Sequence, residues 1–542
     1  MAERRAAVLD YGAFQQPPSP LFRDYLMSRN GVAPFYAGGR WDLDAIATVA
    51  DQAARAPRDR QEVANALVAQ QRARGAERAA EQASRLADKD AAAILTGQQA
   101  VLFGGPLYVL YKAIAAVKLA RLLEERRGAP VVPVFWVASD DHDFAEIRQV
   151  SVLDEQGRIR SLRYAPKDEP VGQPAASIRL DASISELIDE AVSCLPPSLH
   201  RDAAIERLRA TYRPGVALAS AFAAFLSSLL PELAIMDPAD PALKRLMAPV
   251  MKREIAEASP TSRLAADAAP RLLAAGYHQQ VPVREGFLNL FWYDGERRAL
   301  AVRDGLVELR GTGRRVAPAE AEAALEREPE RFSPGVLLRP LAQDTLLPTA
   351  AYVGGPAEIA YHAQIGPSYA HFGIVRPALV PRPSLTLLEP GQVRALEAES
   401  LSLADLEGDP EALLARWARE AYPEIEAAFA SAKDAVAREL AIVEEKLGAL
   451  DPTLRAAADS ARGRTLFQID GLHEKATRAL KKRDQTRAER LRRTRDALFP
   501  GGSFQERGLG FLGPLARHGT SLVDEIREGM DVFAKGHQVL SL

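Results

Sequence analysis

The clearest pattern of apolar and polar positions lies in residues 91–144. The run Ala91–Leu95 is short, apolar and followed by small polar residues, which predicts a buried parallel strand. From Leu107 to Leu123, apolar residues recur every three or four positions, which predicts a helix with one buried face. A second apolar strand is expected at Val131–Val137. A strand–loop–helix–strand unit of this kind indicates an α/β protein with a parallel sheet and a right-handed crossover.

The same arrangement recurs near residue 350. An apolar strand at Ala350–Val353 is followed by a Gly-Gly-Pro turn and by a helix that carries Glu358 and Tyr361. In open parallel sheets, ligands bind at the carboxyl ends of the strands. The two turns should therefore face one crevice from the same edge of the sheet.

Weaker signals surround these two units. Residues 1–45 are typical of an irregular arm that packs on the core. An insertion at about 150–330 should hold several helices and a hairpin whose turn is Asp294-Gly295. These segments together predict a core domain over residues 1–385.

The composition changes at about residue 386. Apolar residues from Ile425 to Leu450 are spaced three and four apart, as in a heptad seam, and Asp451-Pro452 interrupts it. A second long helix should continue to about Leu498, so residues 386–500 are expected to form an antiparallel coiled-coil hairpin. Within it, residues 471–500 carry 10 Lys and Arg against 4 Asp and Glu, which fits a solvated helix face or a docking surface for an anion. Residues 501–542 should fold back onto the core.

The overall composition is that of an ordinary soluble protein. The 542 residues carry a net charge of −3, which argues against general nucleic-acid binding. The single cysteine, Cys194, excludes a disulfide framework and a thiolate zinc site. The sequence contains neither a signal peptide nor an apolar window of 18 residues, so we expect a cytoplasmic protein with no membrane span.

The loop after the first strand is a candidate anion site. It lacks the spacing of a P-loop or of a dinucleotide-binding fingerprint. A glycine-rich loop at a helix start can nevertheless bind phosphate or carboxylate through backbone N–H groups. A plain tight turn would explain the glycines equally well, but the polar side chains nearby favour the anion site. Its candidate residues are Thr96, Gly97, Gln98, Gln99, Gly104, Gly105, Tyr108 and Lys112.

The second polar cluster, Asp140-Asp141-His142-Asp143, follows the second strand. Carboxylates and an imidazole at this density could bind Mg²⁺, act as a general base or accept a hydrogen bond from a substrate amine. Asp143 could instead cap the next helix, although a cap would explain only one of the three carboxylates. Zinc is not expected, because no second His or Cys lies at ligand spacing.

Taken together, these strings resemble the cysteine ligases of bacillithiol biosynthesis over nearly the whole chain. The resemblance rests on Thr96-Gly97-Gln98-Gln99 with Gly105-Pro106-Leu107-Tyr108 and Lys112, on Pro133–Val137 leading to Asp141-His142-Asp143, on Tyr352-Val353-Gly354-Gly355-Pro356 with Glu358 and Tyr361, and on Gln505-Glu506-Arg507.

The resemblance implies a Rossmann-like core with inserted connecting segments and a coiled-coil domain that pairs two protomers. It also implies that the protein adds cysteine to glucosaminyl-malate, and it suggests a site for ATP or ADP near the coiled coil. In this interpretation Asp141, His142 and Asp143 bind an amine or act as base, and Lys112 neutralises a phosphate or a malate carboxylate. Tyr352, Gly354, Gly355, Glu358 and Tyr361 form the opposite wall.

Two other functions remain open. The core also resembles class I aminoacyl-tRNA synthetases, but Tyr108 and Tyr111 replace the two histidines of their first-helix motif. The chain could therefore be a scaffold that senses a nucleotide without catalysis, or a nucleotidyltransferase that acts on another small amine. Metabolite profiling of a deletion strain would separate these alternatives.

Overall fold

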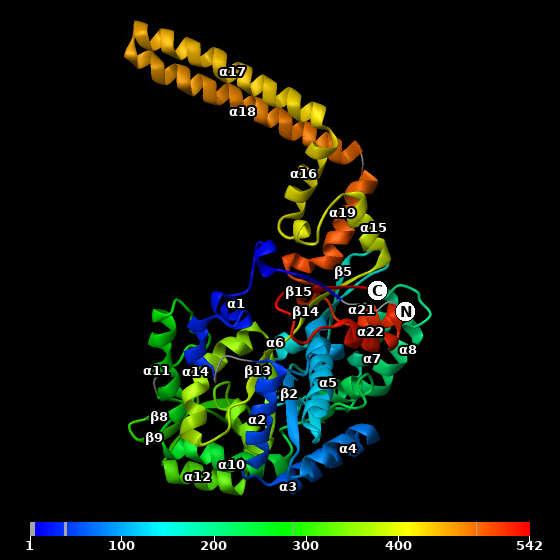
Figure 1. Cartoon of the computed structure of the whole chain (residues 1–542), viewed down its shortest axis with the longest axis vertical. Coiled ribbons are helices and arrows are strands. Elements are labelled where there is room, and N and C mark those ends of the chain that lie inside the picture. Colours follow the sequence, from blue (N-terminus) through cyan, green and yellow to red (C-terminus); the bar gives the residue numbers. More distant parts are fainter. Residues whose placement is uncertain (1–5, 37–40, 285, 484) are drawn as a thin grey trace. The chain divides into compact units, whose positions relative to one another are not determined.

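The computed structural model describes residues 6–36, 41–284, 286–483 and 485–542 (Figure 1). The chain divides into two compact units. One unit comprises Met1–Leu388 with Phe504–Leu542, and the other comprises Glu389–Ser503. Residues 1–5 and 37–40 of the predicted arm, and residue 484 of the predicted second long helix, lie outside the described residues.

A five-stranded parallel sheet forms the centre of the first unit. Its strand order is β13-β12-β2-β3-β6, and every neighbouring pair is parallel. The strands are almost entirely apolar and buried, because helices cover both faces of such a sheet. This arrangement confirms the predicted Rossmann-like core. The strands are β2 (Ala92–Gln98), β3 (Val131–Val137), β6 (Ala234–Met236), β12 (Thr349–Gly354) and β13 (Ala378–Pro381).

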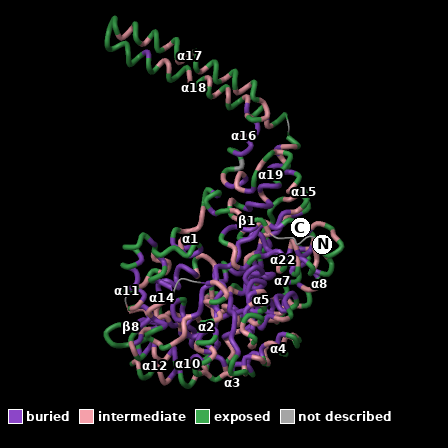
Figure 2. Tube along the Cα trace, in the orientation of Figure 1, coloured by how far each residue is buried: buried purple, intermediate pink, exposed green. Residues whose placement is uncertain are grey.

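Helix α5 (Leu107–Arg127) is the crossover between β2 and β3 and ends at Gly128, whose φ of 63° suits glycine. The sequence predicted one buried face, but α5 is buried on most of its surface (Figure 2). The reason is distant chain: α2 (Leu43–Arg55), α20 (Gln505–Gly508) and α22 (Ser521–Gly529) all pack against it. Buried polar residues on α5 must therefore find partners inside the protein.

The insertion between β3 and β12 carries a second sheet and most of the remaining helices. That antiparallel sheet has the order β10-β9-β8-β7-β11. The predicted Asp294-Gly295 turn joins β7 to β8, and Gly295 has a φ of 81°. The strands of the insertion are β4 (Gln149–Leu153), β5 (Ile159–Arg163), β7 (Phe287–Tyr293), β8 (Arg297–Arg303), β9 (Leu306–Leu309), β10 (Arg315–Val316) and β11 (Phe332–Pro334). The helices are α6 (Phe144–Ile147), α7 (Ser183–Cys194), α8 (Arg201–Thr211), α9 (Leu218–Ser227), α10 (Pro241–Ala256), α11 (Pro260–Ala274), α12 (Pro318–Arg327) and α13 (Arg339–Leu346).

The N-terminal arm is more regular than its sequence suggested. Helix α1 (Pro20–Leu26) begins at the Ser19 cap and buries Phe22 and Tyr25. Strand β1 (Ala7–Leu9) pairs with β15 (His537–Ser541), which also pairs with β14 (Ser384–Leu388). The prediction of an irregular arm was wrong here, because these elements are stabilised by partners that are remote in sequence.

A buried ion pair joins this small sheet to the core. The Arg382 guanidinium donates two hydrogen bonds to Glu506, at 2.7 and 2.8 Å, and the two side chains are 4% and 2% exposed. Ser384 bridges the cluster by donating to Glu506 at 3.0 Å and contacting Nδ1 of His537 at 2.8 Å. Burial lowers the pKa of His537 to about 4, so the imidazole is neutral near pH 7.

The second unit is helical and contains the predicted hairpin. Helix α17 (Pro423–Leu450) and helix α18 (Pro452–Arg483) run side by side, and Asp451 caps the second helix by accepting from the Thr453 N–H. Polar contacts link the helices: Arg462 to Glu444 at 2.8 Å, His473 to Glu426 at 2.6 Å, and Lys433 to Asp470. The helices around this hairpin are α15 (Pro390–Ala398), α16 (Pro410–Ala421) and α19 (Gln485–Leu498).

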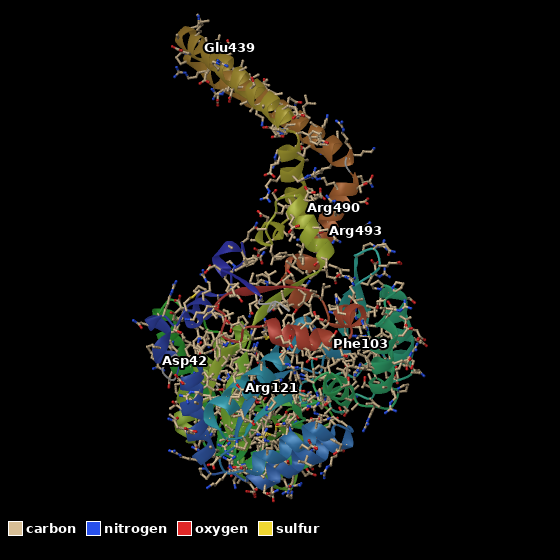
Figure 3. All side chains as sticks on the ribbon, turned by 45° about the vertical axis from the view of Figure 1, so that its right-hand side comes forward. Asp42, Phe103, Arg121, Glu439, Arg490 and Arg493 are labelled. Atoms are coloured by element: carbon tan, nitrogen blue, oxygen red, sulfur yellow. The ribbon has the colours of Figure 1, made fainter. Side chains whose placement is uncertain are left out.

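Several basic residues of the stretch 471–500 are paired within the second unit. Arg487 and Arg490 both contact Glu399, and Lys481 and Arg492 both contact Glu411. Figure 3 shows Arg490 and Arg493 on α19 and Glu439 on α17. Internal pairing of these cations weakens the case for a docking surface. Among the described helices, none is both long and apolar enough to cross a membrane.

We predict that breaking the Arg382–Glu506 pair destabilises the first unit strongly. Arg382→Met leaves Glu506 charged and buried, which typically costs about 3–5 kcal/mol. Chemical denaturation followed by circular dichroism should show this loss. The matched control is Arg126→Met, which removes an exposed ion pair with Asp44 and should change little. Equal effects of the two substitutions would contradict the prediction.

Candidate functional site

The carboxyl ends of β2 and β12 meet at one edge of the central sheet. The strands are direct parallel neighbours, with Leu95 opposite Tyr352. The Thr96 hydroxyl donates to the Val353 carbonyl at 2.9 Å and so joins the two strand ends. The turns that follow the strands therefore lie side by side, as their sequences predicted.

Lys112 connects the two turns. Its ammonium lies 2.6 Å from Oε2 of Glu358, 2.5 Å from the Gly97 carbonyl and 3.4 Å from Oε1 of Gln98. The Lys112 side chain is 1% exposed, whereas that of Glu358 is 22% exposed. Glu358 therefore forms the solvent-facing end of a pair whose cation is buried.

Both carboxylate oxygens of Glu358 accept hydrogen bonds. Its Oε2 also accepts from the Gly355 N–H at 2.7 Å, and its Oε1 accepts from the Tyr352 hydroxyl at 2.5 Å. Burial raises the pKa of this carboxyl, whereas the charge and hydrogen bond of Lys112 lower it. The lowering is the larger effect, so the net shift of the pKa is downward. Glu358 thus stays ionised and fixes the start of α14 (Pro356–Phe372).

These contacts correct the role expected of Lys112. An ammonium has three donors, and all three already have acceptors in the protein. Glu358 also balances its charge. Lys112 is therefore placed to position Gln98 and Glu358, and it has no donor left to neutralise a phosphate or a malate carboxylate.

The loop that contains Gly104 and Gly105 was expected to bind an anion through its backbone N–H groups, but these groups have partners within the protein. The Gly104 N–H donates to the Tyr212 hydroxyl at 3.2 Å, the Gly105 N–H donates to the Leu102 carbonyl at 3.0 Å, and the Leu107 N–H donates to the Leu509 carbonyl at 2.9 Å. A Cβ at Gly104 would lie 2.4 Å from the Phe511 ring, so close packing explains this glycine. The C-terminal segment occupies the helix start, and these amides provide no ready anion site.

Aromatic rings and guanidinium groups complete this edge. Arg339 donates to the Tyr361 hydroxyl at 2.7 Å, and Arg382 lies over the Tyr108 ring at 5.3 Å. Gln98 donates to the Tyr108 hydroxyl at 3.2 Å. Burial raises the pKa of Tyr361 to about 12, so its hydroxyl keeps its proton. Neither arginine was predicted from the sequence, because Arg339 begins α13, Arg382 directly follows β13, and no local motif marks them.

The side chains of the Asp140–Asp143 cluster have different partners. Both carboxylate oxygens of Asp140 accept from Lys244, at 2.7 and 2.8 Å, and Lys244 is 1% exposed. Asp143 caps α6 by accepting from the Glu146 N–H at 3.2 Å, which is the alternative that its sequence left open. Among the described residues, no group of three or more His, Cys, Asp and Glu side chains is arranged to hold a metal ion.

Asp141 and His142 form the accessible part of this cluster, with side chains 33% and 39% exposed. Gln99 donates to Asp141 at 2.7 Å, which links the ends of β2 and β3. Burial raises the pKa of Asp141, but hydrogen bonds from the backbone N–H of His142 and from Gln99, with the charge of Arg297, lower it well below its usual range. Asp141 is therefore a fixed anion, better suited to bind an amine than to remove its proton.

Arg297 sets the tautomer of His142. Its Nη1 lies 3.3 Å from Nδ1 of His142, and its guanidinium stacks 3.6 Å from the centre of the Phe291 ring. A guanidinium only donates hydrogen bonds, so Nδ1 is assigned as the acceptor and the ring proton lies on Nε2. His142 can then donate through Nε2. Arg297 is a further residue that the sequence analysis missed, because it belongs to the second sheet.

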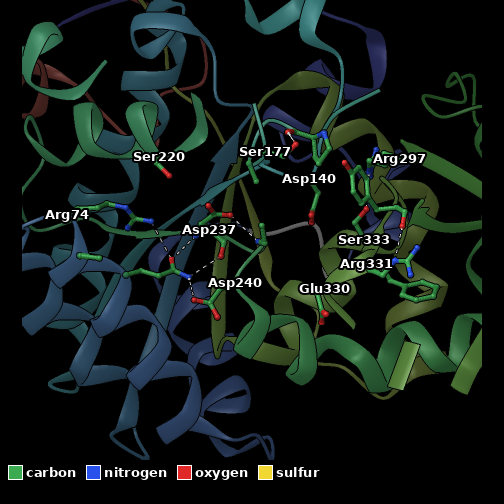
Figure 4. A pocket seen from close by; sticks show the side chains of 17 residues that line it. Arg74, Asp140, Ser177, Ser220, Asp237, Asp240, Arg297, Glu330, Arg331 and Ser333 are labelled. Atoms are coloured by element: carbon green, nitrogen blue, oxygen red, sulfur yellow. Dashed lines mark hydrogen bonds between the residues drawn. The ribbon is translucent and has the colours of Figure 1, made fainter. Parts of the chain in front are cut away.

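A cavity of about 550 Å³ lies beside Asp140, where the ends of β3 and β6 face the second sheet. Figure 4 shows Arg74, Asp237 and Asp240 on one side, Arg297 and Arg331 on the other, and Asp140 between them. Burial raises the pKa of Asp237, whose Oδ1 accepts from the Ser139 hydroxyl. Acidic and basic side chains therefore both line the cavity, with Arg74 beside Asp237 and Asp240 on one side and Arg297 and Arg331 on the other.

Asp141 should contribute to stability in a pH-dependent way. Because its pKa is lowered on folding, the contribution is present above the unfolded pKa of about 3.9 and is lost as the pH falls below it. We expect the difference in unfolding free energy between the protein and Asp141→Asn to stay level from about pH 8 to 5 and to shrink below about pH 4. Urea unfolding across this range would measure it.

Asp143→Asn is the control for that series. Asparagine caps a helix as well as aspartate does, so this variant should change the unfolding free energy little at any pH. A difference for Asp141→Asn that grows as the pH falls would contradict the assignment of Asp141 as a stabilised anion.

Comparison with known proteins gives matches over almost all of the chain. Residues 9–383 match the family model described as the N-terminal Rossmann-like domain of bacillithiol biosynthesis BshC. Residues 385–542 match the C-terminal coiled-coil domain of the same family.

Curated relatives align end to end with the chain. A protein of Salinibacter ruber is 36% identical over 100% of this chain and 99% of its own length. A protein of Koribacter versatilis is 34% identical over 93% of this chain and 94% of its own, and one of Solibacter usitatus is 33% identical over 96% and 97%. Each of these relatives bears the name "Putative cysteine ligase BshC".

Proposed function

The chain belongs to the BshC family of bacillithiol biosynthesis, and from that premise we propose that it is a ligase that joins cysteine to glucosaminyl-malate through an amide bond. The observation that carries the proposal is the accessible Asp141–His142 pair, held by Gln99 and Arg297 at the sheet edge where such folds bind ligands. A fixed carboxylate beside an imidazole donor suits an amine nucleophile and a carbonyl oxygen.

In the proposed reaction, the amine nitrogen attacks the carbonyl carbon of an activated cysteine carboxyl. The carbon–nitrogen bond forms, the bond to the leaving group breaks, and the amine loses a proton. Asp141 would orient the amine by accepting its hydrogen bond, while Nε2 of His142 would donate to the oxygen that gains negative charge. Lys112 and Glu358 would fix the opposite side of the crevice.

Activation of a carboxyl group requires an energy source, and we propose ATP with its accompanying Mg²⁺, leaving ADP or another nucleotide product. The N–H groups of Gly104, Gly105 and Leu107 are paired and Lys112 is neutralised by Glu358, so these groups do not offer a phosphate cradle. The roles given to Asp141 and His142 therefore do not depend on where the nucleotide binds. We also propose that the reaction takes place in the cytoplasm.

The direct test is ligation by the pure protein with cysteine, glucosaminyl-malate and ATP, followed by mass spectrometry of the product. Asp141→Asn should lower kcat by about 10²–10⁴-fold, because the amine loses its anionic partner. Asp143→Asn is the matched control and should retain activity, since an asparagine side chain at this position can still cap α6. Absence of product with every nucleotide tested, together with normal thiol levels in a deletion strain, would overturn the ligase proposal and favour the nucleotide-sensing scaffold.

We also propose that the hairpin of the second unit pairs two copies of the chain. Several of its large apolar side chains are exposed, which is unusual for a helix surface that stays in water. On α18, Phe467 is 71% and Leu472 is 59% exposed. Others on the hairpin are Ile442, Val443, Leu450 and Leu454. A second copy would cover them.

Phe467→Asp should therefore weaken self-association. Light scattering across a protein concentration series should show a dimer for the unchanged protein and a shift of at least about tenfold in its dissociation constant for the variant, since about 1.4 kcal/mol corresponds to that factor. Gln468→Asp, at the neighbouring exposed position, is the control and should leave the dimer intact. A monomer at all concentrations would refute the pairing.

A further inference from the structure

The cavity beside Asp140 has no role in the scheme above, although it adjoins the residues proposed to act. Asp140 lines it and Asp141 follows Asp140 in the chain. Arg297 also lines it while contacting His142. Its volume of about 550 Å³ is within the range of about 300–1,000 Å³ that small-molecule sites occupy.

Arg297 is the group in this cavity that is best suited to bind an anion. Its three contacts are with the Ser333 hydroxyl at 3.0 Å, His142 at 3.3 Å and the Pro334 carbonyl at 3.4 Å. A guanidinium has five donors, so two have no acceptor among the described residues. No carboxylate of the described residues forms an ion pair with Arg297 within 4 Å, although the charges of Asp140 and Asp141 act on its guanidinium from farther away. A ligand carboxylate could accept from both of the remaining donors.

The side of the cavity opposite Arg297 carries two carboxylates together with Arg74. Asp237 and Asp240 are held by neighbours, through Ser139 and through Gln70 at 3.2 Å, and both line the cavity. Two exposed hydroxyls, of Ser177 and Ser220, stand above them (Figure 4). Carboxylates and hydroxyls suit the hydroxyl and amine groups of a sugar.

We propose that this cavity binds the amine-bearing acceptor, a hydroxylated amino sugar with a carboxylate side group. The carboxylates lie against Arg297, and the sugar hydroxyls lie toward Asp237 and Asp240. This assignment rests on the proposed function for the identity of the acceptor. It separates the acceptor site from the sheet edge at Gln98 and Glu358, which is left for the activated amino acid.

The test combines binding of three probes with two variants. Calorimetry would compare glucosaminyl-malate, methyl glucosaminide, which lacks the carboxylates, and cysteine. Ser220→Trp fills the cavity from α9, and it should weaken binding of glucosaminyl-malate at least tenfold. Ser193→Trp, at an exposed serine of α7 outside the cavity, is the matched control and should bind normally.

Arg297→Gln tests the carboxylate contact itself. The unchanged protein should prefer glucosaminyl-malate over methyl glucosaminide at least tenfold, and the variant should lose most of that preference. A merely structural role of Arg297 would weaken both ligands equally and leave the preference intact. That result, or normal binding by Ser220→Trp, would overturn the cavity assignment.

The binding readout separates this inference from the proposed function. If ligation proceeds and Ser220→Trp leaves the KM for the acceptor unchanged, the cavity assignment fails and the ligase proposal stands. If the binding pattern is as expected and no amide forms, the ligase proposal fails and the cavity remains a site for this class of ligand. Absence of any binding by the unchanged protein, or displacement of glucosaminyl-malate by cysteine, would refute the cavity assignment.

Discussion

The contact between Lys112 and Glu358 is the constraint on which the sheet edge depends. Lys112 is buried on the crossover helix, and its charge is balanced by a carboxylate from the turn after a different strand. Removing either partner would leave a buried charge or an uncapped helix start, so the two turns are fixed relative to each other. Gln98, Tyr352 and Gly355 take their positions from this contact.

Two ion pairs of different kinds therefore support the same edge. In the Lys112–Glu358 pair the carboxylate is partly exposed to solvent, whereas in the Arg382–Glu506 pair both side chains are buried. The Arg382 guanidinium also covers the Tyr108 ring, whose hydroxyl accepts from Gln98. Residues after 500 thus contribute to the geometry around β2, although they follow the whole second unit in the sequence.

Local patterns predicted what depends on neighbouring residues. The apolar run Val131–Val137 is a strand over the same residues, and the turn after Val353 opens a helix as expected. The roles of Lys112 and of the glycine loop could not be predicted, because Glu358 and Leu509 reach them from distant chain. Arg297 and Lys244 carried no signal for the same reason. An isolated basic residue in a strand or helix looks like a surface residue until its partner is known.

The small sheet β1-β15-β14 has a consequence for the order in which the molecule assembles. Ala7 pairs with Val539, and Ser384 pairs with His537 on the other side of the same central strand. During synthesis, the edges of β1 and β14 stay unpaired until β15 emerges from the ribosome. The hairpin of the second unit lies between β14 and β15 in the sequence, so it can fold before them. Pairings of such long sequence separation form slowly, and open edges invite pairing with other chains. A nascent chain that stalls before residue 537 is therefore expected to be a preferred client of chaperones.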